Sequence, residues 1–231
     1  MKIDIMTLFP DMCDTVLGES IIGRGVKKGI LSFDCLNIRD FTTNKHKSVD
    51  DYPYGGAKGM IMQADPIFRC YEHICENSKE KPHLIYMSPK GTVLTQKRAL
   101  ELSRLSHIVI LCGHYEGVDQ RLLDELEPEE ISIGDYVLTG GELPALVLCD
   151  TVSRLVSGVL SDDECFTDES HFNGLLEHAQ YTRPEIWRGR AVPEVLISGH
   201  HANIEKWKKE NALSCTKERR PDMIKDVYDK D

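Results

Sequence analysis

The sequence predicts an α/β protein with a mostly parallel sheet. Three apolar segments each precede a helical pattern: 83–87 precedes 95–105, 108–112 precedes 118–126, and 131–133 precedes a helix that begins near Glu142. Strands that alternate with helices in this way are typical of a parallel sheet with crossover helices. Each segment ends in glycine, serine or proline turns. Because ligands bind outside the carboxyl ends of strands in open α/β sheets, we expect a ligand site at these turns.

The first part of the chain predicts further elements of the same kind. Residues 3–8 and 31–38 are expected strands that flank a helical pattern over 10–28, and another helix is expected over 65–77. The segment 42–60 is polar and rich in glycine. Structureless loops of this length usually carry function or disorder, so we expect a functional loop here.

The segment 131–150 combines a short strand, two glycine turns and a helix start. Thr139-Gly140-Gly141-Glu142 matches a capping box, in which the Thr and Glu side chains bond the free amides of a helix. Pro144 fits the first helical turn, where a missing N–H is tolerated. The glycines leave the backbone beside the helix start without side chains, which favours docking of a flat polar ligand. An ordinary strand-to-helix connection is the alternative, since single glycine signals are weak.

The remaining sequence divides the chain into three parts. Residues 1–160 are expected to form the α/β domain, and the acidic, turn-rich segment 161–174 a flexible linker. Residues 175–231 are expected to form a small helical domain, with helices over 202–213 and 217–227.

Composition indicates a cytoplasmic protein. No stretch approaches 18 apolar residues, and Met1 leads directly into a strand, so we expect no signal peptide or membrane span. None of the eight cysteines is spaced C-x-x-C, and the nine histidines lack ligand spacing. We therefore expect reduced thiols and no metal site.

Charge is distributed unevenly along the chain. The net charge of −10 argues against nucleic-acid binding, yet residues 183–225 hold ten basic and six acidic side chains. Trp187, Trp207 and the nearby basic residues suit contacts with phosphates and bases. Taken alone, these residues favour the alternative of a solvated helix face with buried tryptophans.

Six segments, in the same order, resemble the bacterial tRNA (guanine-N1)-methyltransferases of the SPOUT superfamily. They are PYGGAKGMIM at 53–62, LCGHYEGVDQR at 111–121, SIGDYVLTGGELPA at 132–145, SRLVSGVL at 153–160, GLLEHAQYTRP at 174–184 and VPEVLISGHHANIEKWK at 192–208. The resemblance implies a trefoil-knotted domain, a homodimer, and methyl transfer from S-adenosylmethionine to N1 of the tRNA guanosine immediately 3′ of the anticodon, position 37. Where the family commonly has Gly-Gly-Gly-Pro-Gly, this chain has Gly-Gly-Ala-Lys-Gly at 55–59, so it departs from the family pattern at the hinge of that loop.

The resemblance also implies the residues of the site. Guanine N1 carries a proton, so a carboxylate must accept it, and a cation should stabilise the charge that grows on O6. The family pattern places the base at Glu169, with Asp168 as its neighbour, and the cation at Arg154. A linker acid and a helix-surface arginine are the structural alternatives. Glu116 suits the sulfonium charge of the methyl donor, unless it is simply an exposed turn carboxylate. The implied cofactor-binding residues are Tyr86, Met87, Ser88, Pro89, Gly113, Tyr115, Glu116, Gly117, Ser132, Ile133, Gly134, Asp135, Tyr136, Val137, Leu138, Gly140, Gly141 and Pro144.

Two other functions compete with this reading. Another SPOUT enzyme would methylate the ribose 2′-oxygen and would not need a linker carboxylate. A non-catalytic RNA-binding protein would account for the basic C-terminal segment, but not for the intact 132–145 motif.

Overall fold

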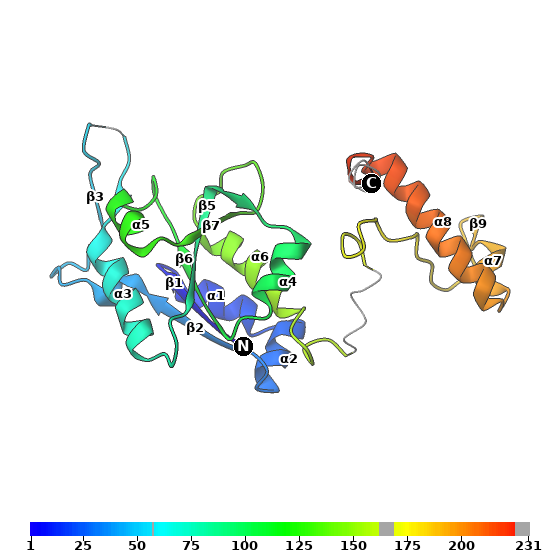
Figure 1. Ribbon diagram of the computed structural model, residues 1–231, viewed down its shortest axis with the longest axis horizontal. Coiled ribbons are helices and arrows are strands. Elements are labelled where there is room, and N and C mark those ends of the chain that lie inside the picture. The colour runs from blue at the N-terminus through cyan, green and yellow to red at the C-terminus, as the bar shows by residue number, and fades with distance from the viewer. Residues whose placement is uncertain (57, 162–168, 225–231) are drawn as a thin grey trace. The chain divides into compact units, whose positions relative to one another are not determined.

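A five-stranded parallel sheet forms the centre of the first of two compact units. The computed structural model describes residues 1–56, 58–161 and 169–224, and its units are Met1–Asp163 and Glu164–Asp231. The strands are ordered β2-β1-β6-β5-β7 (Figure 1), which confirms the predicted fold class. The trefoil knot stays a prediction. The strands are β1 (Lys2–Thr7), β2 (Ser32–Asn37), β5 (His83–Val93), β6 (His107–Cys112) and β7 (Glu129–Ser132).

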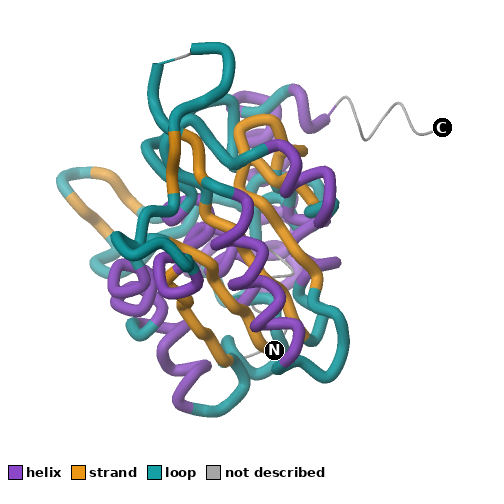
Figure 2. Tube along the Cα trace, turned by 90° about the vertical axis from the view of Figure 1, so that its left-hand side faces the viewer, coloured by secondary structure: helices purple, strands orange, loops and turns teal. Residues whose placement is uncertain are grey.

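Helices cover both faces of this sheet (Figures 1 and 2). Central strands are therefore buried on both sides, and β1 and β6 are buried along all but their first residue, as parallel strands usually are. Met6 and Leu111 belong to the core beneath α3 and α5. The helices are α1 (Pro10–Leu17), α2 (Ser20–Lys27), α3 (Ala64–Glu76), α4 (Gln96–Leu102), α5 (Gln120–Leu126) and α6 (Glu142–Ser153), with a 3₁₀ turn, η1, at Ile38–Phe41.

The helical pattern over 10–28 forms two helices and not one. α1 ends at Gly18, and the chain reverses sharply enough that a Cβ on Gly23 would lie 2.0 Å from the Gly18 carbonyl oxygen. Ser20 has a φ of +53°, in the left-handed region. Apolar periodicity does not reveal this break, because both helices bury residues of the same pattern.

Two other local predictions are wrong. β5 does not end at Met87 but continues to Val93 across a register shift between Met87 and Thr92. Gly91 permits this continuation, since a Cβ there would lie 2.4 Å from the backbone of Glu130. The capping box is also absent: α6 has Gly141 at its N-cap and no side-chain cap.

Glu142, the predicted capping carboxylate, is instead buried between elements. It is 3% exposed and accepts a hydrogen bond from Thr7 Oγ1 at 2.8 Å. A carboxylate that completes a bond to the end of β1 cannot also reach back to its own helix start. Glu142 therefore joins α6 to the sheet.

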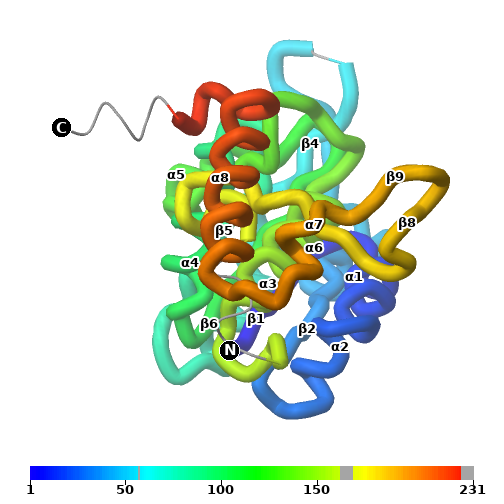
Figure 3. The backbone as a smooth tube through the Cα atoms, turned by 90° about the vertical axis from the view of Figure 1, so that its right-hand side faces the viewer, coloured from blue at the N-terminus to red at the C-terminus, as the bar shows by residue number. Residues whose placement is uncertain are grey.

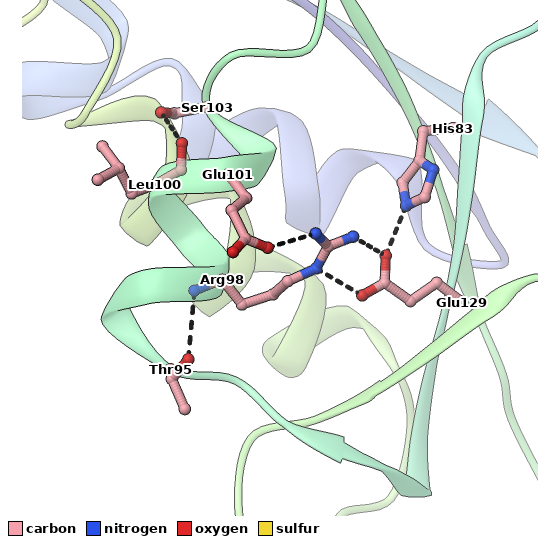
Figure 4. A network of polar contacts seen from close by, with 7 residues as sticks. All are labelled: His83, Thr95, Arg98, Leu100, Glu101, Ser103 and Glu129. Atoms are coloured by element: carbon pink, nitrogen blue, oxygen red, sulfur yellow. Dashed lines mark hydrogen bonds and ion pairs between the residues drawn. The ribbon is translucent and has the colours of Figure 1, made fainter. Parts of the chain in front are cut away.

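A charged cluster ties α4 to the starts of β5 and β7 (Figure 4). Arg98 donates from Nε to Glu129 Oε1 at 2.7 Å and from a second nitrogen to the other oxygen of the same carboxylate. His83 contacts Glu129 from β5, and Glu101 contacts Arg98 within α4. Because β7 is an edge strand, this cluster adds side-chain bonds to its one backbone ladder.

The loop over 42–60 is partly ordered by the short hairpin of β3 (Asp50–Asp51) and β4 (Ile61–Met62). The second unit contains a small hairpin, β8 (Ile186–Trp187) and β9 (Arg190–Ala191), then α7 (Glu194–Ile197) and α8 (His201–Arg219) (Figure 3). The two helices predicted over 202–213 and 217–227 are wrong as separate elements, since α8 continues to Arg219. Residues 225–227 lie outside the described residues.

Two predictions from composition can be compared with the described residues. No helix in this part of the chain has the length and apolar character to cross a bilayer. Seven of the cysteines are described, and each is a free thiol. Cys165 lies outside the described residues.

Candidate cofactor-binding site

A cavity of about 270 Å³ lies at the turns that follow β6 and β7, beside residues 86–90 of β5. Because the strands are parallel, their carboxyl ends meet at one edge of the sheet, as the sequence predicted. The cavity brings together every predicted cofactor residue except Asp135. That these residues bind S-adenosylmethionine stays a prediction.

Several lining residues were not predicted. Three of them, Lys90, His114 and Thr139, lie inside turns that the sequence had already singled out. The others lie on α5, just before α5, or on β7. Their position at the cavity depends on helix packing and strand pairing, which sequence motifs do not show. The unpredicted residues are Lys90, His114, Val118, Gln120, Leu123, Glu130, Ile131 and Thr139.

The turn after β6 is fixed by backbone bonds to the helix start of α6. Gly141 donates to the Gly113 carbonyl at 2.8 Å, and His114 forms an antiparallel bridge with Gly140. Tyr115 has a φ of +59°, a conformation uncommon for a non-glycine residue and frequent at functional sites. Partial burial, followed by the nearby Asp50 carboxylate, raises the pKa of the Tyr115 hydroxyl. The turn is thus held in a strained shape beside the cavity.

Gly140 and Gly141 are packed against protein atoms. A Cβ on Gly140 would lie 2.4 Å from His114 Nε2, and one on Gly141 would lie 2.7 Å from the Cα of Cys112. Gly141 is therefore required for the turns to meet, because the atoms beside it are backbone, whereas the atoms beside Gly140 belong to side chains. That the two glycines also leave room for a ligand stays a prediction.

The glycine-rich loop reaches the same turn. A Cβ on Gly59 would lie 2.5 Å from Glu116 Oε1, and the Glu116 amide donates to the Met60 carbonyl at 3.0 Å. Gly59 has a φ of +95°, so glycine suits this position for its backbone as well. Glu116 itself is exposed. Ala57, where the loop departs from the family pattern, lies outside the described residues.

The two predicted catalytic residues belong to different units. Arg154 directly follows α6 and donates its amide to the Asp150 carbonyl at 3.2 Å. Glu169 is half-buried in the second unit, where its carbonyl accepts from the Phe172 amide at 3.3 Å. Asp168 lies outside the described residues.

The two tryptophans of the second unit have different surroundings. Trp187 is 57% exposed on the β8–β9 hairpin, and the guanidinium carbon of Arg188 lies 5.1 Å from its ring centroid. Trp207, on α8, is half-buried against His178 and Tyr181, with ring centroids 6.1 and 6.3 Å away. The packed-tryptophan alternative thus fits Trp207, whereas Trp187 is available for a ligand.

Comparisons of the chain with a family model and with individual known proteins point to the same family. The family model described as tRNA (Guanine-1)-methyltransferase TrmD matches residues 1–226. The chain is 57% identical over 230 residues to the tRNA (guanine-N(1)-)-methyltransferase of Ruminiclostridium cellulolyticum, with 100% of this chain and 99% of that protein covered. Identity to the protein of the same name from Clostridioides difficile is 50% over 231 residues, with 100% of both chains covered. Matches of this extent show that the chain belongs to the tRNA (guanine-1)-methyltransferase TrmD family.

Proposed function

We propose that the protein transfers a methyl group from S-adenosylmethionine to N1 of guanosine 37 in tRNA. The observation that carries this proposal is that two of the family motifs, at 111–121 and 132–145, line one cavity together with residues 86–90 of β5. Relatives that cover the whole chain are named for N1 methylation of guanine in tRNA. Their names favour this function over ribose methylation and over RNA binding without catalysis.

The cavity residues fit S-adenosylmethionine. Met87, Leu138 and Pro144 provide apolar walls for an adenine ring, and the turn backbones provide donors and acceptors for its edge. Glu116 adds a carboxylate at the rim, which suits a positively charged ligand. When bound, this cofactor supplies an electrophilic methyl group on a cationic sulfur.

The chain's own residues would prepare guanine for this reaction. The carboxylate of Glu169 accepts the N1 proton, so that the N1 lone pair becomes available to attack. The guanidinium of Arg154 stabilises the negative charge that moves to O6. Glu169 is one methylene longer than the family's usual aspartate, and a turn-rich segment is able to absorb that length.

A second copy of the chain would complete the site. α1 and α6 pack against each other and carry large apolar side chains that are 40–52% exposed: Phe9, Met12, Val16, Leu143 and Val147. Exposed apolar faces of this kind mark association surfaces, and a homodimer pairs the same face from both copies. The face adjoins the cavity, because the Phe9 ring centroid lies 5.2 Å from that of His114.

The decisive test combines product mapping with a change at the base. Purified protein is incubated with labelled S-adenosylmethionine and unmodified tRNA, and the methylated nucleoside is identified. Glu169→Gln should lower turnover roughly 10²–10⁴-fold, the range for a lost general base, and keep tRNA and cofactor affinity. Glu169→Asp should keep much of the activity.

Asp168→Asn is the matched control and should lower turnover only slightly. A variant pattern in which Asp168→Asn abolishes turnover and Glu169→Gln does not would make Asp168 the base. Methylation mapped to a ribose oxygen, or no methylation at all, would reject the proposed function.

A further inference from the structure

One carboxylate oxygen in the cavity wall lacks a hydrogen-bond donor. Glu130 lies on β7 and lines the cavity. Its Oε2 atom is buried, and no donor among the described residues lies within hydrogen-bonding distance. Buried polar atoms are nearly always paired, because an unpaired one has lost its water without gaining a partner. The Oε2 atom of Glu130 is therefore free to accept a hydrogen bond from a donor outside these residues.

The Glu130 side chain lies on the cavity side of the sheet next to Tyr86. Glu130 and Tyr86 are direct neighbours in the register of β5 and β7, so their side chains share one face. Burial, and then the Glu130 carboxylate, raise the pKa of Tyr86 to about 12, which is consistent with this proximity. The Tyr86 hydroxyl oxygen extends toward the turn after β6, 2.9 Å from where a Gly113 Cβ would lie. The free oxygen thus lies in a recess shared with a phenol.

The surroundings favour a neutral donor over a cation. Burial of an ammonium group requires loss of its full hydration, and the cavity offers a second carboxylate, Glu116, that is exposed. Acidic side chains hold ribose hydroxyls in this way in dinucleotide-binding folds.

We infer that Glu130 accepts a hydrogen bond from a ribose hydroxyl of the bound nucleoside and so helps to select a ribonucleoside cofactor. This role rests on the proposed use of S-adenosylmethionine. It adds to the cavity a side-chain contact with the sugar, distinct from the backbone contacts expected for the adenine.

Calorimetric binding tests this role without any turnover. The ligands are S-adenosylhomocysteine, 5′-methylthioadenosine, and the 2′-deoxy and 3′-deoxy forms of the latter. In the unmodified protein, removal of the contacted hydroxyl should weaken binding about 10- to 100-fold, as expected for a hydrogen bond to a charged group. In Glu130→Ala, removal of the same hydroxyl should change binding less than about threefold. Glu125→Ala, an exposed residue of α5, is the matched control and should behave like the unmodified protein.

Any of the following results would overturn the assignment of Glu130 to a ribose hydroxyl. If Glu130→Ala binds S-adenosylhomocysteine normally, Glu130 makes no contact. If the variant weakens S-adenosylhomocysteine but not 5′-methylthioadenosine, the partner is the amino-acid tail. If Glu130→Ala does not fold, Glu130→Gln, which keeps the shape, should still reduce the hydroxyl dependence, and an unchanged dependence rejects the role. If the unmodified protein binds none of these ligands, both the role of Glu130 and the proposed function are rejected.

Discussion

Single backbone positions decide whether the cavity can form, and Gly141 is the clearest of them. A Cβ at this position would lie 2.7 Å from the Cα of Cys112 and 2.8 Å from the Gly113 amide nitrogen. Both are backbone atoms of the neighbouring strand end, so neither is able to rotate away. Gly141→Ala should therefore lower the free energy of unfolding by about 1–3 kcal/mol, as for overpacked cores.

Urea denaturation measures this change. Gly18→Ala is the control, because a Cβ there would lie 3.2 Å from the Asp14 carbonyl oxygen and Gly18 already has a helical φ of −76°. We expect it to change stability by less than about 0.5 kcal/mol. A Gly141→Ala protein as stable as the parent would show that the turns are able to separate without cost.

At the residue scale, the sequence motifs predicted most of the residues that line the cavity, but not those on β7 and α5. Residues such as Gly113 and Leu138 lie in turns whose composition marks them. Glu130 and Leu123 lie in a strand and a helix, and their orientation depends on which strands pair. The sequence gives no register, so the unpaired carboxylate of Glu130 was not predictable.

At the scale of elements, the charged cluster of α4, β5 and β7 should make stability depend on pH. Burial alone would raise the pKa of Glu129, but hydrogen bonds from Arg98 and His83 hold it below the usual value. A carboxyl with a lowered pKa stabilises the folded state above its unfolded pKa, about 4.3. That contribution is lost as the pH falls through the folded value.

Glu129→Gln should therefore cost about 1–2 kcal/mol at pH 6 and progressively less below pH of about 4, measured by urea denaturation across pH. Glu101→Gln removes the more exposed contact with Arg98 and should cost less than about 0.5 kcal/mol. Equal losses at pH 6 and pH 3 would mean that Glu129 acts through its shape and not its charge.

The β8–β9 hairpin predicts a separate effect on RNA. Trp187 presents an exposed ring with Arg188 over it, and stacking of a base on an aromatic ring contributes about 1–3 kcal/mol. Trp187→Ala should weaken tRNA binding roughly 5- to 100-fold in filter binding and leave S-adenosylhomocysteine affinity unchanged. Trp187→Phe should recover much of the loss. Normal tRNA affinity in Trp187→Ala would assign RNA contact to other residues.

Helix starts and ends were the least predictable features at this scale. Every α-helix described in the first unit overlaps a segment predicted to be helical, yet the 3₁₀ turn at Ile38–Phe41, the break at Gly18 and the end of β5 at Val93 were not predicted. The predicted capping box does not form, because Thr7, far away in the chain, competes for the Glu142 carboxylate.

For the whole molecule, we expect a homodimer that uses the apolar face of α1 and α6. Light scattering should give about twice the chain mass of 26.2 kDa. Val16→Lys combined with Val147→Lys places charge on two side chains that are 52% and 46% exposed. The double variant should become monomeric and lose activity, whereas Val93→Lys, also exposed but outside this face, should remain dimeric. A fully active monomer would reject a site shared between copies.

Part of the cavity lining is the main chain of glycine turns, and this has a consequence for inhibitor resistance. Substitution of Gly141 would drive a Cβ to within 2.8 Å of backbone atoms of Cys112 and Gly113. Compounds that bond the main chain of these turns would therefore face few tolerated escape mutations. Compounds that depend on Gln120, whose side chain is exposed on α5, would lose potency through a single harmless exchange. Assays of single-substitution variants at these positions, with one compound of each kind, should separate the two kinds by how many active variants escape inhibition.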